Sequence, residues 1–190
     1  MKNKIHNYDF LVIGAGLIGS LTAISLLKNN YKVLVIDKNK QISKDNRTLA
    51  VNANSKDFLV SLGLWNKLKA NPEPINKIEI SDTINQSPLI FENINEEMGN
   101  VILNRDLLVE AKQFLLKKNI LIEDVNIEIS KIKSNEKIRI KHKNYFFKKI
   151  ILCLGKNYDD DATIKKFSIP SLHKSYVGFF DHSIVHNQTA

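Results

Sequence analysis

The sequence DFLVIGAGLIGSLTAISLLKNNYKVLVID, residues 9–37, predicts a strand, a helix and a second strand in direct succession. Residues 9–13 form a short apolar run that ends at a glycine, which is typical of a buried strand. Apolar side chains then recur every three or four positions over residues 17–30, as they do on one face of a helix. Residues 32–37 form a second apolar run that ends on an acid. Because a helical crossover makes the two strands it connects parallel, the stretch predicts an α/β fold.

The turn between the first strand and the helix, GAGLIG, has glycines at positions 14, 16 and 19. In a dinucleotide-binding turn, Gly14 would permit the tight bend, Gly16 would let the backbone approach a pyrophosphate, and Gly19 would let the helix lie close to the strand. The amides near Ile18 would then meet the phosphate charge, and Asp37 would accept hydrogen bonds from ribose hydroxyls. An acid in this place favours FAD or NAD over NADP. The alternative is a glycine-rich turn that binds no nucleotide.

After residue 40 the pattern of the chain becomes less regular. Residues 41–54 are polar and predict a loop, and residues 104–118 predict an amphipathic helix that Asn104 caps. Short alternating segments between residues 120 and 149 predict a β-meander. The remaining predictions are a helix over 55–68 that Gly63 interrupts, paired strands over 75–82 and 88–94, a central strand over 150–155, and a strand over 175–187 that begins a new sheet.

Composition is that of an ordinary globular protein, with 43% hydrophobic and 25% charged residues. The net charge of +8 comes from lysines scattered along the chain, without a basic run longer than two residues, so we expect no nucleic-acid partner. The single cysteine, Cys153, excludes an internal disulfide and is expected to be a packed side chain rather than a nucleophile. No apolar run reaches the ~18–20 residues needed to span a bilayer, which predicts a soluble protein.

Arginine is scarce in this lysine-rich chain, with three arginines beside 25 lysines. Only arginine offers a rigid planar fork to phosphate or carboxylate, so Arg47, in the polar stretch DNRTLAV, suggests a place where lysine would not serve. From the residues alone, the preferred interpretation of Arg47 is an exposed loop charge. For Arg105 it is a surface helix residue paired with Glu110 or a nearby acid.

Several stretches together resemble a known family: DFLVIGAGLIGSLTAISLL, VLVIDK, DNRTLAVNANSKDFLVSLGLW, PINKIEISD, EEMGNVILNRDLL and VGFFDHSIVHN. They resemble the FAD-dependent aromatic hydroxylases of the para-hydroxybenzoate hydroxylase type, and within these the ubiquinone-biosynthesis hydroxylases. The resemblance implies a Rossmann-like FAD-binding domain with an inserted β-meander, plus the beginning of a substrate-domain sheet. The implied segments are residues 1–72 and 100–170 for the FAD-binding domain, and 73–99 and 171–190 for the substrate-domain sheet.

The resemblance also implies a cofactor, a reaction and a set of binding residues. FAD would be the cofactor, NAD(P)H the reductant, and an aromatic, polyprenyl-type compound the substrate that is hydroxylated. No catalytic side chain and no metal ligand are expected, because the flavin carries the chemistry. The implied cofactor-binding residues are Gly14, Gly16, Ile18, Gly19, Asp37, Lys38, Arg47 and Arg105.

Family members are about twice as long as this chain, and their later glycine–aspartate segment has no counterpart in it. We therefore expect a truncated enzyme or one half of a split enzyme, whose second polypeptide supplies the remainder. The alternatives are an inactive FAD-binding remnant and an NAD-binding oxidoreductase module. The expected location is the cytoplasm, with a peripheral contact at the inner membrane as a further expectation.

Overall fold

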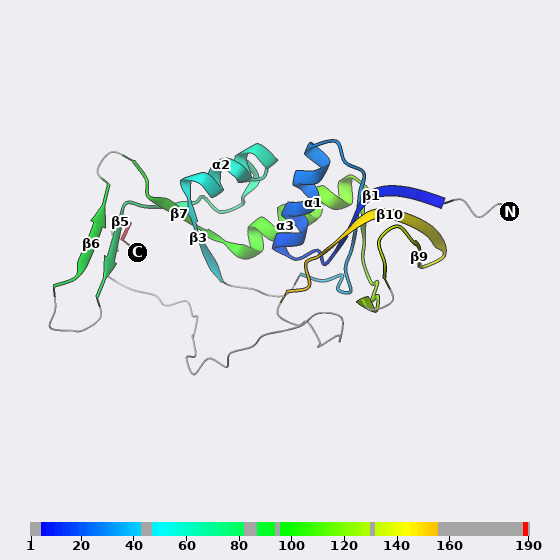
Figure 1. Ribbon diagram of the computed structural model, residues 1–190. Coiled ribbons are helices and arrows are strands. Elements are labelled where there is room, and N and C mark those ends of the chain that lie inside the picture. Colours follow the sequence, from blue (N-terminus) through cyan, green and yellow to red (C-terminus); the bar gives the residue numbers. More distant parts are fainter. Residues whose placement is uncertain are drawn as a thin grey trace. The chain divides into compact units, whose positions relative to one another are not determined.

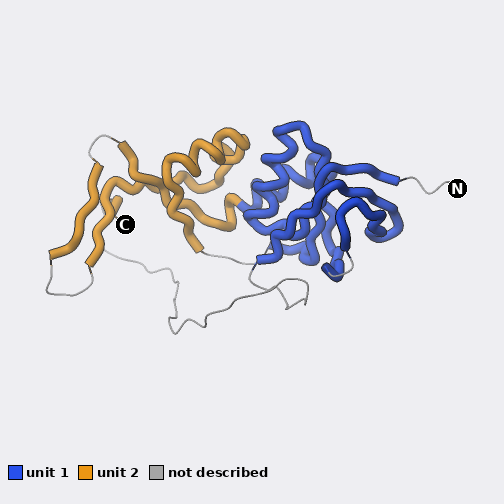
Figure 2. The backbone as a smooth tube through the Cα atoms, in the orientation of Figure 1, with its two compact units in different colours: residues 1–43, 108–174 blue, residues 44–107, 175–190 orange. Residues whose placement is uncertain are grey.

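The computed structural model describes residues 5–42, 47–81, 87–93, 96–129, 132–155 and 188–189. The chain forms two compact units, coloured blue and orange in Figure 2. The first unit comprises residues 1–43 and 108–174, and the second comprises residues 44–107 and 175–190. The expected four-segment division, with boundaries after residues 72, 99 and 170, stays a prediction.

The first unit is built on a five-stranded sheet with the strand order β8–β2–β1–β10–β9 (Figure 1). Its strands are β1 (Ile5–Ile13), β2 (Val33–Ile36), β8 (Leu121–Ile122), β9 (Lys137–Ile140) and β10 (Lys143–Leu152). β1 pairs in parallel with β2 and β10, β8 pairs in parallel with β2, and β9 alone is antiparallel to its neighbour. Helix α1 (Leu17–Lys28) joins β1 to β2, so the predicted strand–helix–strand unit and the α/β fold class are confirmed.

Both faces of the central strands are buried, as expected for a parallel sheet covered on each side. Alternate residues of β1 and β2 enter one apolar cluster, which β10 completes with Tyr145 and Phe147. The residues between them, such as Val12 and Val35, are also fully buried and point to the opposite face. Each such side chain contributes about 1.5–3 kcal/mol on burial, so this sheet is the stable base on which the turn after β1 is held.

The second unit contains a three-stranded antiparallel sheet in the order β3–β7–β4. Its strands are β3 (Thr48–Asn52), β4 (Glu73–Ile75) and β7 (Gly99–Leu103). Helix α2 (Ala53–Leu62) follows β3, the 3-10 helix η1 (Trp65–Lys67) follows α2, and α3 (Asn104–Lys117) follows β7. Residues of α3 from Leu108 onward belong to the first unit.

A separate hairpin in the second unit pairs β5 (Lys77–Ile80) with β6 (Leu89–Glu92) in antiparallel register. This pairing confirms the predicted strand partners. Ile78 lies opposite Phe91 and Ile80 lies opposite Leu89, so one side of the hairpin is apolar. We call these four residues the apolar hairpin face.

Two predictions in the region after residue 40 need correction. Residues 41–54 were expected to form a loop, but β3 begins at Thr48 because it pairs along its whole length with β7, far away in the sequence. Helix α2 was expected to start at Ser55, but Asn52 is the cap, and its side chain accepts a hydrogen bond of 2.9 Å from the Ser55 amide. The interruption at Gly63 is confirmed, since this residue ends α2 with φ +72°.

The predicted β-meander is also wrong in its extent. Among the described residues it is reduced to one antiparallel hairpin, β9–β10, while β8 joins the parallel part of the sheet. Ile127 and Ile132 lie outside the described strands and pack against the apolar cluster, so their apolar character reflects burial rather than a strand ladder. The predicted central strand over 150–155 is the last part of β10, which ends at Leu152.

The strand predicted over residues 175–187 lies outside the described residues. Of the helices that the structure describes, none has both the length and the apolar character required to cross a bilayer.

Candidate nucleotide site

Two glycines of the turn after β1 are required by the fold itself. Gly14 has φ +104°, and a Cβ there would lie 2.2 Å from the carbonyl oxygen of Cys153. A Cβ on Gly19 would lie 1.9 Å from the carbonyl oxygen of Gly14. Helix α1 therefore rests directly on the turn, and the turn rests on the chain that leaves β10.

Gly16 differs from these two glycines. Its backbone is extended, with φ −66° and ψ −177°, a conformation that any residue adopts. A Cβ added there would meet nothing within 4 Å. The protein's own packing therefore gives no reason for a glycine, whereas a ligand that approaches this backbone closely would give one.

The start of α1 is arranged to receive negative charge. Gly16 is the N-cap and supplies no side-chain hydrogen bond, and the first turn carries no acidic residue. The first amides of a helix have no intrahelical acceptor, and they carry the positive end of the helix dipole. Ile18, in this first turn, is 69% exposed. The helix start thus offers its amides to an anion, as the sequence predicts.

Asp37, directly after β2, fastens the turn in place. Its Oδ2 accepts a hydrogen bond from the Ala15 amide at 2.5 Å, and its Oδ1 accepts one from the Asn39 amide at 2.7 Å. Its own amide donates to the carbonyl of Ile122. A carboxylate has about four acceptor positions, so the half-exposed group retains capacity for ribose hydroxyls. The fastening role was missed in the sequence because it depends on contacts between separate loops.

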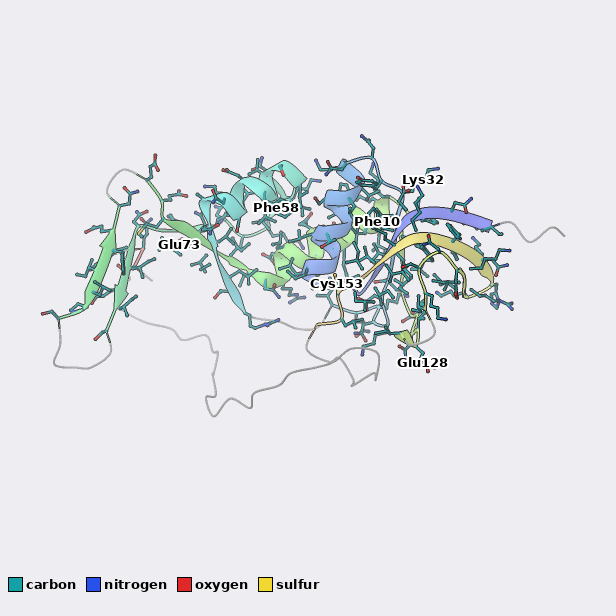
Figure 3. All side chains as sticks on the ribbon, viewed as in Figure 1. Phe10, Lys32, Phe58, Glu73, Glu128 and Cys153 are labelled. Carbon is teal, nitrogen blue, oxygen red and sulfur yellow. The ribbon has the colours of Figure 1, made fainter. Side chains whose placement is uncertain are left out.

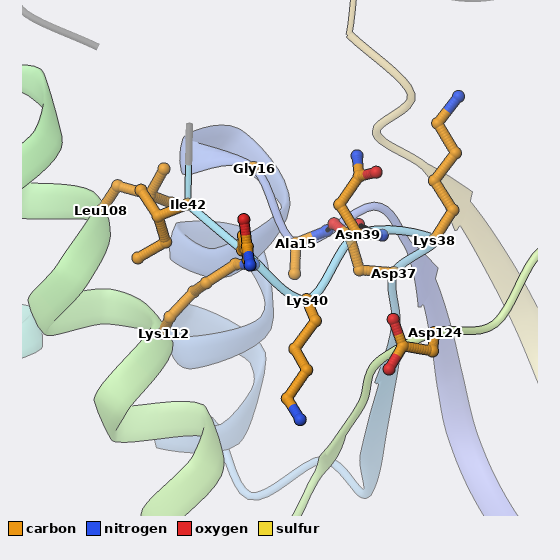
Figure 4. Close-up of a pocket in the computed structure, with 11 residues that line it drawn as sticks. Ala15, Gly16, Asp37, Lys38, Asn39, Lys40, Ile42, Leu108, Lys112 and Asp124 are labelled. Atoms are coloured by element: carbon orange, nitrogen blue, oxygen red, sulfur yellow. Dashed lines mark hydrogen bonds between the residues drawn. The ribbon is translucent and has the colours of Figure 1, made fainter. Parts of the chain in front are cut away.

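A pocket of about 700 Å³ opens beside this turn, within the first unit (Figure 4). Its lining comes from three places: Ala15 and Gly16 of the turn, residues 37–42 after β2, and Leu108, Lys112 and Asp124. The structure therefore brings together the predicted residues Gly16, Asp37 and Lys38. Gly14 and Gly19 are not among the lining residues, and their close backbone contacts shape the turn.

The pocket is lined by side chains of both charges, and no sequence motif predicts this combination. Lys38, Lys40 and Lys112 line it with Asp37 and Asp124. Lys40, Lys112 and Asp124 were not predicted. Lys112 follows Leu108 by four positions on α3, so the helical spacing places both side chains on one face. No local sequence motif distinguishes Lys112 from the other lysines of the chain.

Arg47 and Arg105 lie in the second unit, and both side chains are exposed. The Arg47 carbonyl accepts a hydrogen bond of 3.0 Å from the Asn104 amide, so the backbone of Arg47 is joined to the residue that precedes Arg105. The contact of these two arginines with a cofactor stays a prediction.

Cys153, labelled in Figure 3, lies just after β10 and is a half-buried free cysteine. Its amide donates to the carbonyl of Ile13 at 2.8 Å. Burial raises the pKa of its thiol, because desolvation disfavours the thiolate. The thiol therefore stays protonated at neutral pH, in line with the expectation that Cys153 is not a nucleophile.

Comparisons with known proteins relate most of the chain to an FAD-binding family. Residues 7–135 match the family model described as FAD binding domain. The ubiquinone biosynthesis monooxygenase COQ6 of Dictyostelium discoideum is 30% identical over 139 residues, which are 59% of this chain and 28% of that protein. The ubiquinone hydroxylase UbiL of Rhodospirillum rubrum is 30% identical over 106 residues, which are 51% of this chain and 24% of that protein. The chain thus spans about a quarter of the length of these relatives.

Solved structures show the same fold at low sequence identity. FqzB has a TM-score of 0.64 at 13% identity, with 81% of this chain and 37% of that chain covered. PqsL of Pseudomonas aeruginosa, described as a probable FAD-dependent monooxygenase, has a TM-score of 0.61 at 12% identity, with 76% and 42% covered.

Proposed function

The chain belongs to the FAD-binding domain family, and we propose that it forms the FAD-binding part of a flavin-dependent monooxygenase. The observation that carries the proposal is the turn at Gly16. There the backbone is open toward the pocket although nothing in the protein's packing requires a glycine. A cofactor whose phosphates approach that backbone accounts for the residue.

The residues of the pocket fit the adenosine diphosphate half of FAD. The amides at the start of α1 would hold the pyrophosphate, and Asp37 would accept hydrogen bonds from the ribose while it keeps the turn closed. Lys38 would lie beside the adenine. When bound, the flavin supplies the oxidation chemistry with oxygen, and the protein's part is to bind and orient the cofactor.

The proposed reaction is hydroxylation of an aromatic ring in quinone biosynthesis, with a polyprenyl-type substrate and NAD(P)H as the reductant. The support is that both curated relatives carry names that refer to ubiquinone biosynthesis or hydroxylation. The chain matches about a quarter of the length of these relatives, and we propose that the active enzyme also needs the remainder, whether on the same polypeptide or on a second one. We propose a cytoplasmic location, and a peripheral contact at the inner membrane stays an expectation.

Purification of the chain and measurement of its flavin content test the cofactor assignment. We expect FAD to be retained, with a flavin absorption spectrum, and FMN not to be retained, because the pocket residues address the half of FAD that FMN lacks. Binding of NADH with no retention of FAD would instead support the NAD-binding module. NADH-dependent oxygen consumption by the chain alone would contradict both the remnant and the need for a second polypeptide.

The exposed arginines provide a matched pair of variants for the same experiment. Arg47→Ala should lower the flavin content, because it removes an expected phosphate contact. Arg139→Ala in β9 removes an equally exposed arginine and should leave the flavin content unchanged. Equal flavin content in the two variants would contradict the role of Arg47.

A further inference from the structure

Lys112 is a buried lysine whose ammonium group has one long ion pair among the described residues. The residue is 6% exposed, although its side chain ends in an ammonium group. Burial of such a charge is costly unless hydrogen bonds and an opposite charge compensate it. Its ion pair with Glu123 joins Lys112 Nζ to Glu123 Oε1 at 3.7 Å, which is longer than the ~2.7–3.2 Å of a hydrogen bond.

The position of Lys112 suggests what completes its surroundings. Lys112 and Leu108 project from the same side of α3 toward the segment that contains Lys40 and Ile42, and all four residues line the pocket (Figure 4). The same pocket is lined by Gly16, the cap of α1, whose first amides favour an anion. The ammonium and the helix start therefore face one cavity with the same electrostatic preference.

We infer that Lys112 is a phosphate-binding residue of this pocket, with its ammonium group directed to the phosphates of a nucleoside diphosphate. The inference rests on the proposed nucleotide site and adds to it a residue outside the glycine turn. In the unliganded protein Glu123 holds the ammonium loosely, and on binding the phosphate oxygens become its stronger partners. Lys38 and Lys40 are exposed at the pocket, so the buried Lys112 is the lysine whose charge solvent screens least.

The test uses the full chain and three probes: adenosine, AMP and ADP, each measured by competition with FAD fluorescence. Lys112→Met keeps the length of the side chain and removes the charge. We expect it to weaken ADP binding about tenfold, the loss of one charged hydrogen bond, and to leave adenosine binding unchanged. Lys112→Arg, which keeps the charge, should retain most of the affinity for ADP.

Lys117→Met is the matched control, because Lys117 lies on the same helix, is exposed and does not line the pocket. It should bind ADP as the parent chain does. Urea denaturation of each variant shows that the folded state is retained, which we expect for Lys112→Met because methionine suits a buried position.

Glu123→Gln separates phosphate binding from a purely structural role. If the ion pair served only to hold the loop after β8, loss of the carboxylate would weaken ADP binding as much as loss of the lysine. We expect the opposite, unchanged or tighter ADP binding, since Glu123 competes with the phosphates for the ammonium.

Equal ADP affinity in Lys112→Met and the parent would overturn the inference and leave the proposed FAD site standing. An equal loss of affinity for adenosine and for ADP would also overturn the inference, because it would place Lys112 at the nucleoside. Failure of the parent chain to bind either FAD or ADP would contradict the proposed function itself.

Discussion

At the residue scale, the glycines of the turn after β1 differ in what a methyl group would meet. Gly14→Ala would place its Cβ against the Cys153 carbonyl at an unfavourable φ, so we expect the free energy of unfolding to fall by about 2–4 kcal/mol. Gly16→Ala has neither problem, and its stability should stay within about 0.5 kcal/mol of the parent. Its flavin content should nevertheless fall, because the new methyl occupies the approach to the backbone.

Urea denaturation and flavin content, measured on both variants, check this contrast. A Gly16→Ala protein with the parent's flavin content would show that no ligand passes close to this residue. A Gly14→Ala protein with the parent's stability would show that the turn can move away from Cys153.

The predictability of the site also varies residue by residue. Gly14, Gly16, Gly19 and Asp37 could be found from the sequence because they belong to one continuous strand–turn–helix–strand stretch with fixed spacing. Lys112 could not, because it reaches the pocket only through the packing of a helix that lies far along the chain.

At the scale of elements, an ion pair links the two longest strands of the sheet. Asp9 Oδ1 on β1 lies 2.7 Å from Lys148 Nζ on β10. This bond, with a second from the Lys32 amide, holds the pKa of Asp9 below its usual 3.8. A carboxyl with a lowered pKa in the folded state stabilises the protein above its unfolded pKa, and that contribution is lost as the pH falls through the lowered value.

We therefore expect the melting temperature of the parent to fall more steeply below about pH 4 than that of Asp9→Asn. Thermal melts of both proteins between neutral and acidic pH measure the difference. The effect should be small and should shrink in high salt, because the pair is solvent-accessible. Parallel curves for the two proteins at low salt would contradict this contribution of Asp9.

The elements show where sequence patterns suffice and where they do not. The segments of residues 9–37 were predicted correctly because local periodicity and the glycine turn agree. β3 and β7 were not predicted as strands because each is short. Each is stabilised by pairing with the other, although a long stretch of chain separates them in the sequence. The isoleucines near position 127 caused the opposite error, the prediction of a strand where there is none. Their side chains pack against the apolar cluster, but they do not belong to a strand.

At the scale of the whole molecule, the second unit exposes the apolar hairpin face. Ile80 is 53% exposed, Leu89 58% and Phe91 44%. A two-stranded hairpin is marginal by itself, and exposed apolar surface on it favours association between molecules. We expect the isolated chain to self-associate as its concentration rises.

The double variant Ile80→Lys with Leu89→Glu places opposite charges on a facing pair, so it should keep the hairpin and reduce association. Sedimentation velocity over a range of concentrations measures the change, and flavin content should stay constant. The exchange Lys77→Glu with Glu92→Lys alters a facing pair on the opposite side and serves as the control. If both double variants associate like the parent, the apolar hairpin face is not the cause.

The pairing of β1 with β10 has a consequence for the time course of folding. β1 finds β2 through a short crossover, but its other neighbour comes from the last third of the chain, as the pair Leu11 and Ile150 shows. Contacts between such distant parts form late, because a long loop must close first. Since a Cβ on Gly14 would meet the Cys153 carbonyl, the turn after β1 reaches its final shape only when β10 docks. During synthesis, nucleotide binding would therefore begin only after β10 has left the ribosome. The time at which the cofactor binds would then report when this sheet is complete.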